Sequence, residues 1–110
     1  MSGYNGWANY ETWNVKLWID NSEGDQEYWN ERAQAAWDDT DDEDTLEDRS
    51  CNARTALEKE IESSFQENAP KLTGTYADLL GAALSSVDWR EIADSLLSDI
   101  EIEEYKAKSA

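Results

Sequence analysis

The stretch from Tyr10 to Asn21 constrains the fold most, because its apolar residues recur at helical spacing. At about 100° per residue, one face carries an apolar arc, formed by Tyr10, Trp13, Leu17 and Trp18 and widened by Val15 and Ile19. The polar residues Thr12, Lys16 and Asp20 are spaced four residues apart and form a narrow strip on the helix. An arc this wide predicts a helix contacted from more than one side, at the centre of the core. Asn14 points into the arc and is expected to need a hydrogen-bond partner there.

The same periodicity predicts further helices over about 23–37 and 44–67. The apolar positions of the first are Tyr28, Trp29, Ala33, Ala36 and Trp37. Those of the second form one stripe with Phe65 at its edge, made of Leu46, Ser50, Ala53, Leu57, Ile61 and Ser64. Pro70 ends this second segment, because the residue before a proline avoids helical geometry.

Two more helices are predicted over about 76–84 and 87–105. The first follows a capping-box-like sequence at Thr75–Asp78 and is expected to bury Tyr76, Leu79, Leu80, Ala83 and Leu84. The inner stripe of the second comprises Trp89, Ile92, Ala93, Leu96, Leu97 and Ile100. The sequence thus predicts an all-α fold, a compact bundle of about five helices around a Trp-rich core. It forms a single domain over 1–110, with an irregular N-terminus at 1–8, an acidic loop at 38–48 and a frayed tail at 106–110.

Charge limits the classes of partner. The chain has 26 Asp and Glu against 9 Lys and Arg, a net charge of −17. Direct binding to nucleic acid or to an anionic membrane is electrostatically disfavoured, so the expected partners are cations or proteins with basic surfaces. No signal peptide and no run of about 20 apolar residues occurs, which predicts a cytoplasmic protein. The wide apolar arc and the small core leave a homodimer open.

The chain lacks the residues that several kinds of catalysis require. The chain has no histidine and one cysteine, Cys51, which excludes His-based triads and Cys- or His-ligated metal sites. No glycine-rich phosphate loop occurs. The acidic block fails the EF-hand pattern, because counting from Asp39 puts Asp44 at position six and Ser50 at position twelve. The sequence predicts no metal, no cofactor and no enzyme, although a hydrolase with two facing carboxylates stays a third alternative.

Carboxylates gather in three bands, Glu23–Glu31, Asp38–Asp48 and Glu58–Glu67, with a fourth on the last predicted helix. Acids four apart on a helix lie about 6 Å apart along its axis, which is similar to the roughly 6–7 Å between neighbouring phosphates of a strand. A rigid helical protein with this coat can imitate the charge pattern of DNA. The residues expected to bind the partner are Asp38, Asp39, Asp41, Asp42, Glu43, Asp44, Glu47, Asp48, Glu58 and Glu62. A coat that serves only solubility is the alternative.

Two segments also carry a family resemblance. Asn9–Asn21 (NYETWNVKLWIDN), followed by Glu23 and Tyr28-Trp29, resembles the N-terminal signature of a family of small proteins of bacteriophages, plasmids and other mobile elements. Asp78–Leu84 (DLLGAAL) and Val87–Ala93 (VDWREIA) resemble its C-terminal half. The resemblance covers nearly the whole chain except 38–48. It carries no catalytic or ligand assignment and implies a mobile-element origin.

These features together predict an inhibitor of a basic nucleic-acid-binding host defence protein, of restriction or CRISPR type, that acts by charge mimicry inside a bacterial host. The alternative is a non-inhibitory interaction module of a phage or plasmid. That module would bind through exposed aromatic anchors at Trp7, Tyr4 or Trp37. Exposed aromatic clusters would favour the module, whereas evenly acidic faces would favour the mimic.

Overall fold

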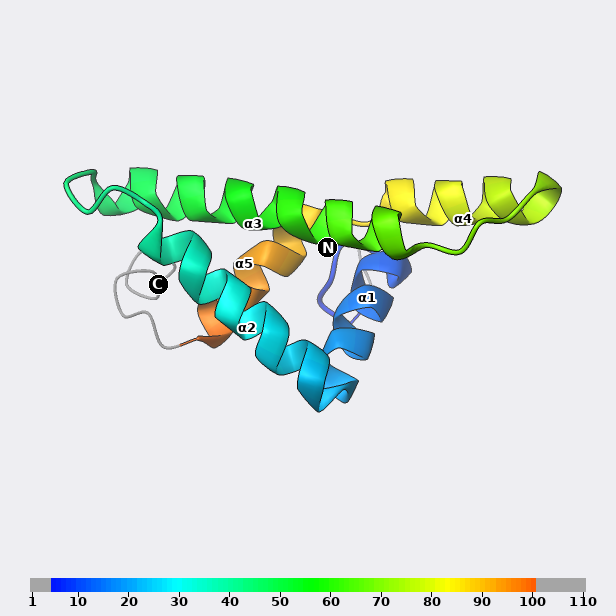
Figure 1. Cartoon of the computed structure of the whole chain (residues 1–110), viewed down its shortest axis with the longest axis horizontal. Helices are drawn as coiled ribbons and strands as arrows, with labels where there is room; N and C mark the ends of the chain where they lie inside the picture. The colour runs from blue at the N-terminus through cyan, green and yellow to red at the C-terminus, as the bar shows by residue number, and fades with distance from the viewer. Residues whose placement is uncertain (1–4, 101–110) are drawn as a thin grey trace.

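The computed structural model describes residues 5–100 and contains five helices in that range (Figure 1). They are α1 (Tyr10–Asn21), α2 (Glu23–Asp38), α3 (Leu46–Asn68), α4 (Gly74–Ser86) and α5 (Trp89–Asp99). Residues 5–100 include no strand, so the predicted all-α fold is confirmed. The acidic connection is shorter than expected and covers 39–45. The N-terminal residues 1–4, the end of the last predicted helix (101–105) and the tail 106–110 lie outside the described residues.

α3 organises the arrangement (Figure 1). It runs along the longest of the three dimensions, 49 × 31 × 25 Å, and packs against α2 and α5. α1 packs against α2, α4 and α5. The loop 39–45 and the start of α4 lie at opposite ends of the molecule (Figure 1).

The core is built mainly where α2, α3 and α5 meet. The α3 stripe is buried at Ser50, Ala53, Leu57 and Ile61, whereas Leu46 is exposed. The α5 stripe is buried as predicted at Trp89, Ile92, Ala93, Leu96 and Leu97. α2 contributes Trp29, Ala33, Ala36 and Trp37, but Tyr28 is exposed. A Trp-rich core is not confirmed, because three of the six tryptophans are only half-buried or exposed: Trp7, Trp13 and Trp18.

The prediction for α1 was wrong about which face points inward. Thr12 and Lys16, from the predicted outer strip, are buried together with Ile19. Tyr10 and Trp18, from the predicted inner face, are 51% and 65% exposed. Helical spacing alone had favoured the side with the larger area of apolar surface.

Hydrogen bonding explains why Thr12 faces inward. Asn9 caps α1, since its Oδ1 accepts from the Thr12 N–H (2.9 Å) and from the Thr12 hydroxyl (2.6 Å). Thr12 Oγ1 in turn accepts from the N–H of Asp88 (2.8 Å), and Asn9 Nδ2 donates to the carbonyl of Ser86 (2.6 Å). These bonds join the start of α1 to the α4–α5 junction. Without these hydrogen bonds, burying Thr12 would cost the full desolvation free energy of its hydroxyl group.

Lys16 lies one turn further along the same face. Its Nζ donates to Asp20 at 2.8 and 3.0 Å and to Asp99 of α5 at 3.1 Å. Its methylene stem is covered while the ammonium reaches two partly exposed carboxylates. Lys16 therefore ties α1 to the end of α5.

The prediction that α4 buries its apolar face was also wrong. None of its residues is buried, and Tyr76 and Leu79 are 72% and 61% exposed. The expected capping box at Thr75 is absent, because α4 begins at Gly74 after Thr73. Asn14, expected to be inside the core, is half-buried and lines a groove between α1 and α4.

Replacing Thr12 tests the hydrogen-bonded junction. Thr12→Val keeps the shape but removes the bonds to Asn9 and to the Asp88 N–H, so the free energy of unfolding should fall by about 1–2 kcal/mol. Urea denaturation followed by circular dichroism measures it. Thr75→Val is the matched control, because Thr75 is an exposed helical threonine. Equal losses in the two variants would contradict a specific role for the junction.

The buried hydroxyl of Ser50 allows a second stability test. Ser50 is 1% exposed, and its Oγ has no hydrogen-bond partner among the described residues. Ser50→Ala should raise the free energy of unfolding by about 0.5–1 kcal/mol, because a desolvated, unpaired hydroxyl is removed. Ser63→Ala, on the exposed side of the same helix, measures the helix-propensity gain alone. A smaller gain for Ser50→Ala than for Ser63→Ala would show that the Ser50 hydroxyl is stabilising.

Candidate protein-binding surface

The outer face of α2 carries a line of carboxylates. Glu23, Glu27 and Glu31 follow each other at four-residue spacing, about 6 Å apart along the axis, and all are exposed. Asp38, seven residues after Glu31, lies on the same side and leads into the loop 39–45. We call the exposed carboxylates of this face, the loop and the start of α3 the acidic ridge: Glu23, Glu27, Glu31, Asp38, Asp39, Asp41, Asp42, Glu43, Asp44, Glu47 and Asp48.

The loop of the ridge is a structured turn. Asp41 Oδ1 accepts from the N–H of Glu43 (2.9 Å), and the Asp41 carbonyl accepts from the N–H of Asp44 (3.0 Å). Thr45 then caps α3 by accepting from the N–H of Asp48 (3.1 Å). Aspartate and threonine suit these positions because their short side chains bond to nearby backbone groups. Asp41 is thus partly structural, whereas Asp42 and Asp44 project from the turn as exposed carboxylates.

Arg49 fixes the loop to the helices on both sides. Its guanidinium lies 4.4 Å from the ring centroid of Trp37, and its Nε donates to Thr40 Oγ1 (2.9 Å). The Thr40 hydroxyl donates to the carbonyl of Trp37 (2.6 Å). A flat guanidinium can stack and donate at once, which an ammonium cannot do. No spacing in the sequence indicates this contact, and the sequence analysis missed it.

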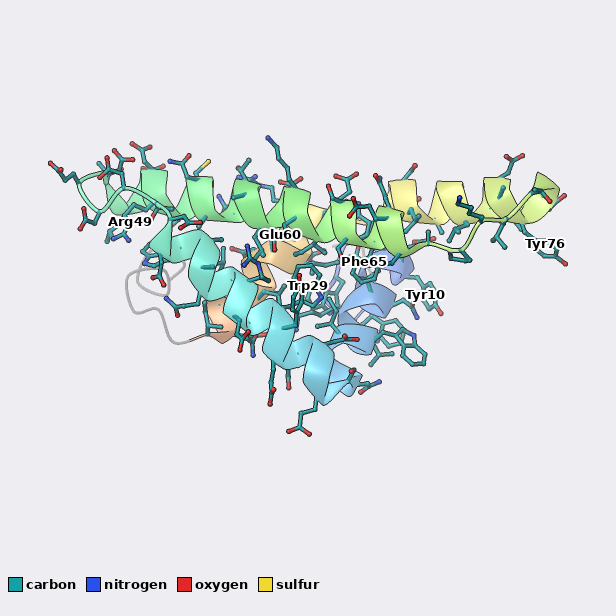
Figure 2. The ribbon with its side chains drawn as sticks, in the orientation of Figure 1. Tyr10, Trp29, Arg49, Glu60, Phe65 and Tyr76 are labelled. Carbon is teal, nitrogen blue, oxygen red and sulfur yellow. The ribbon has the colours of Figure 1, made fainter. Side chains whose placement is uncertain are left out.

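The predicted binding residues separate into two groups. The eight from Asp38 to Asp48 are all exposed and lie together around the loop (Figure 2). Glu58 lies about 15 Å further along α3 than Asp48 and pairs with Arg90 of α5 (3.4 Å). Glu62 is half-buried and accepts from Gln66 (3.3 Å). The structure therefore does not join Glu58 or Glu62 to the ridge.

Ion pairs between helices use carboxylates outside the ridge. Arg32 of α2 pairs with Glu60 of α3 through two of its nitrogens, and Arg54 of α3 pairs with Asp94 of α5. The hydrogen bond to Glu60, and then its charge, raises the pKa of Arg32 above the usual value. Within residues 5–100, no carboxylate of the ridge forms an ion pair. The carboxylates of the ridge are therefore exposed and free of direct ion pairs within this range.

One depression does bring acids together, as a hydrolase would require. It has a volume of about 280 Å³ and is lined by Arg54, Asp88, Arg90, Glu91 and Asp94. Each carboxylate there already has a structural partner. Asp88 caps α5, Glu91 accepts from the Ala8 N–H (2.9 Å), and Asp94 pairs with Arg54. This arrangement ties the N-terminal segment and α3 to α5.

Residues 5–100 contain neither a cluster of metal-ligating side chains nor a membrane-spanning helix. Nowhere in this range do three or more His, Cys, Asp or Glu side chains come together as a metal-binding group. None of the five helices combines the length and the apolar character needed to cross a bilayer.

Substitution of Arg49 tests how the loop is held. Arg49→Lys keeps the charge but loses the stacking on Trp37 and the directed bond to Thr40, so amides of 39–45 should exchange hydrogen faster. The global stability should fall by at most about 1 kcal/mol. Hydrogen exchange with mass spectrometry measures both. Arg90→Lys is the control, because Arg90 contacts Glu58 and lies outside the loop. Unchanged exchange in the loop would show that Arg49 does not hold it.

Comparisons with known proteins place the chain in a family. No curated protein and no solved structure matches it. A family model described as a family of unknown function (DUF7249) matches residues 1–109. Since this match covers almost the whole sequence, the chain belongs to the DUF7249 family.

Proposed function

We propose that this protein binds a basic, nucleic-acid-binding protein through the acidic ridge and occupies the surface that nucleic acid would use. The observation that carries the proposal is the ridge itself, an exposed row of carboxylates that makes no ion pair within residues 5–100. The protein acts as a binding module and an inhibitor, not as an enzyme.

The geometry of α2 supports charge mimicry. From Glu23 to Asp38 the helix extends about 22 Å. Its outer carboxylates repeat at about 6 Å from Glu23 through Glu27 to Glu31, and Asp38 follows about 10 Å further on. Neighbouring phosphates along one strand are separated by roughly 6–7 Å. A groove that binds three consecutive phosphates can therefore meet a carboxylate at each position from Glu23 to Glu31, and further ones at Asp38 and the loop.

The same physics provides the driving force. Basic nucleic-acid-binding surfaces gain affinity by releasing condensed counterions, so their affinity falls as salt rises. A chain of net charge −17 also attracts counterions, and it is steered over long range toward a positive groove. The proposed complex should therefore share the salt dependence of the nucleic acid complex that it replaces.

The resemblance described above implies a mobile-element origin, and this suggests the class of target. A phage or plasmid protein that blocks DNA-binding sites would act inside the bacterial host, against a defence protein of restriction or CRISPR type. Membership in a family of unknown function adds no assignment.

The alternative module needs different anchors from those predicted. Trp37 is buried, Trp7 packs against the core, and Tyr4 lies outside the described residues. Four of the seven large apolar side chains exposed within residues 5–100 lie instead on α1 and α4, namely Tyr10, Trp18, Tyr76 and Leu79. Exposed aromatic residues favour the module, and the α1–α4 surface carries three of them. That surface is far from the loop of the ridge, and a different occupant is argued for it below.

Two charge-reversed variants test the proposal. Asp42→Lys with Asp44→Lys should weaken binding to the target by roughly tenfold, since two exposed attractions become repulsions. The target is first captured from a bacterial lysate with the tagged protein, and its affinity is then measured by calorimetry at several salt concentrations. Double-stranded DNA should compete, and affinity should fall steadily with salt.

Glu67→Lys combined with Ser63→Lys and Gln66→Lys is the matched control, because it makes the same total change in charge at exposed positions of α3 that lie outside both the ridge and α4. It should weaken binding by less than about threefold. An affinity independent of salt, or an effect of this control equal to that of Asp42→Lys with Asp44→Lys, would contradict recognition by the ridge.

A further inference from the structure

α4 extends to the end of the molecule opposite the loop 39–45 (Figure 1). Large apolar side chains of α4 and of the neighbouring α1 are exposed there. A groove of about 330 Å³ lies between the two helices, with Phe65 of α3 at its base. Its walls are mostly apolar: Tyr10, Val15 and Trp18 from α1, Leu80, Ala83 and Leu84 from α4, and Val87 after α4. Figure 2 shows Tyr10 on the side of α1 that faces α4, and Tyr76 near the free end of α4.

The exposed area is large for a protein of this size. Tyr10, Trp18 and Tyr76 are 51%, 65% and 72% exposed, so the three rings alone present on the order of 400 Å². Leu72 and Leu79 add to this area. Soluble monomers rarely expose apolar patches above a few hundred Å², whereas a stable interface buries about 800 Å² on each side. The rings would supply about half of such an interface.

α4 itself also lacks cover. It has 13 residues, none buried, and its main helix contact is with α1. A helix of this length is marginal in water unless an apolar face is packed. Leu79 and Tyr76 would provide that packing only if a further surface lay against them.

Charge indicates what the occupant is. The groove contains one charged residue, Glu11, and α4 contains one, Asp78. A basic partner would be drawn more strongly to the ridge at the other end than to this weakly acidic surface. A second copy, with net charge −17, must avoid the ridge and can approach only where charge is sparse. The molecule is 49 Å long and the screening length in physiological salt is about 8 Å, so copies joined at α4 keep their loops apart.

The shape of α4 matches a second α4. Exposed large side chains, Tyr76 and Leu79, lie in its first half, and the small groove residue Ala83 lies one turn after Leu79. Around a two-fold axis near Gly81, antiparallel helices would set Leu79 of one copy over Ala83 of the other. Each large side chain then meets a small one, and Tyr76 comes near the far end of the other helix. We propose that this protein forms a two-fold dimer through antiparallel α4 helices packed into the α1–α4 grooves.

Sedimentation over low to high micromolar concentrations tests the dimer. The wild-type chain should sediment as a dimer that dissociates on dilution. Leu79→Glu should raise the dissociation constant at least tenfold, because it puts two carboxylates into the apolar contact. Leu46→Glu is the matched control, since Leu46 is an exposed leucine at the other end of the molecule and its change adds the same charge. It should leave the dissociation constant within about twofold of wild type.

Cross-linking tests the register. In a Cys51→Ser background, chains with Leu79→Cys mixed with chains with Ala83→Cys should form a covalent heterodimer on mild oxidation, and neither chain alone should cross-link efficiently. Efficient cross-linking of each chain alone would overturn the antiparallel register. The dimer would be overturned if the wild-type chain sedimented as a monomer at every concentration, or if Leu46→Glu raised the dissociation constant as much as Leu79→Glu. The groove would then be a candidate binding site for a different protein. The pair Asp42→Lys with Asp44→Lys should not change the dimer, so a failure here is separate from a failure of the ridge.

Discussion

The contact between Thr12 and the α4–α5 junction sets the orientation of α1, and much of the structure depends on it. Thr12 accepts from the Asp88 N–H and shares the Asn9 cap, and Lys16 reaches Asp99 one turn later. These bonds require the polar strip of α1 to face inward. Tyr10 and Trp18, on the other side, are then directed toward solvent and toward α4. A buried polar contact thus creates an exposed apolar surface.

Ion pairing distinguishes the ridge from the other carboxylates of the surface. Four of the seven cations in residues 5–100 pair with carboxylates, and in each case at least one pair joins two helices. A fifth, Arg49, lies over Trp37 and holds the loop. Carboxylates at the helix contacts are therefore neutralised by neighbours, whereas those on the outer face of α2 and on the loop are not. The acidic coat is uneven, and its strongest part surrounds a turn that the protein holds in place.

The sequence predicted those parts of the fold that depend on periodicity. The stripes of α3 and α5 were correct at Leu57, Ile61, Ile92 and Leu96, because apolar spacing there coincides with the side that packs. The prediction failed for α1 because two specific bonds of the Thr12 hydroxyl outweighed a larger apolar area, and one of them joins residues 76 positions apart. The eight predicted binding residues from Asp38 to Asp48 lie around one loop because they are neighbours in the sequence. Glu58 could not be separated from them beforehand, because its partner Arg90 comes from a distant helix.

The positions of the two surfaces connect their proposed roles. Since α4 and the loop 39–45 lie at opposite ends of the long axis, a dimer through α4 would carry its two loops at its outer ends (Figure 1). Two ridges on one particle can engage two basic sites, and the second contact then forms at a raised effective concentration. Such a gain requires a target with repeated or two-fold related grooves, which is common among oligomeric DNA-binding proteins. A target with a single groove would gain nothing from the dimer, so the size of the loss caused by Leu79→Glu in target binding reports on the symmetry of the target.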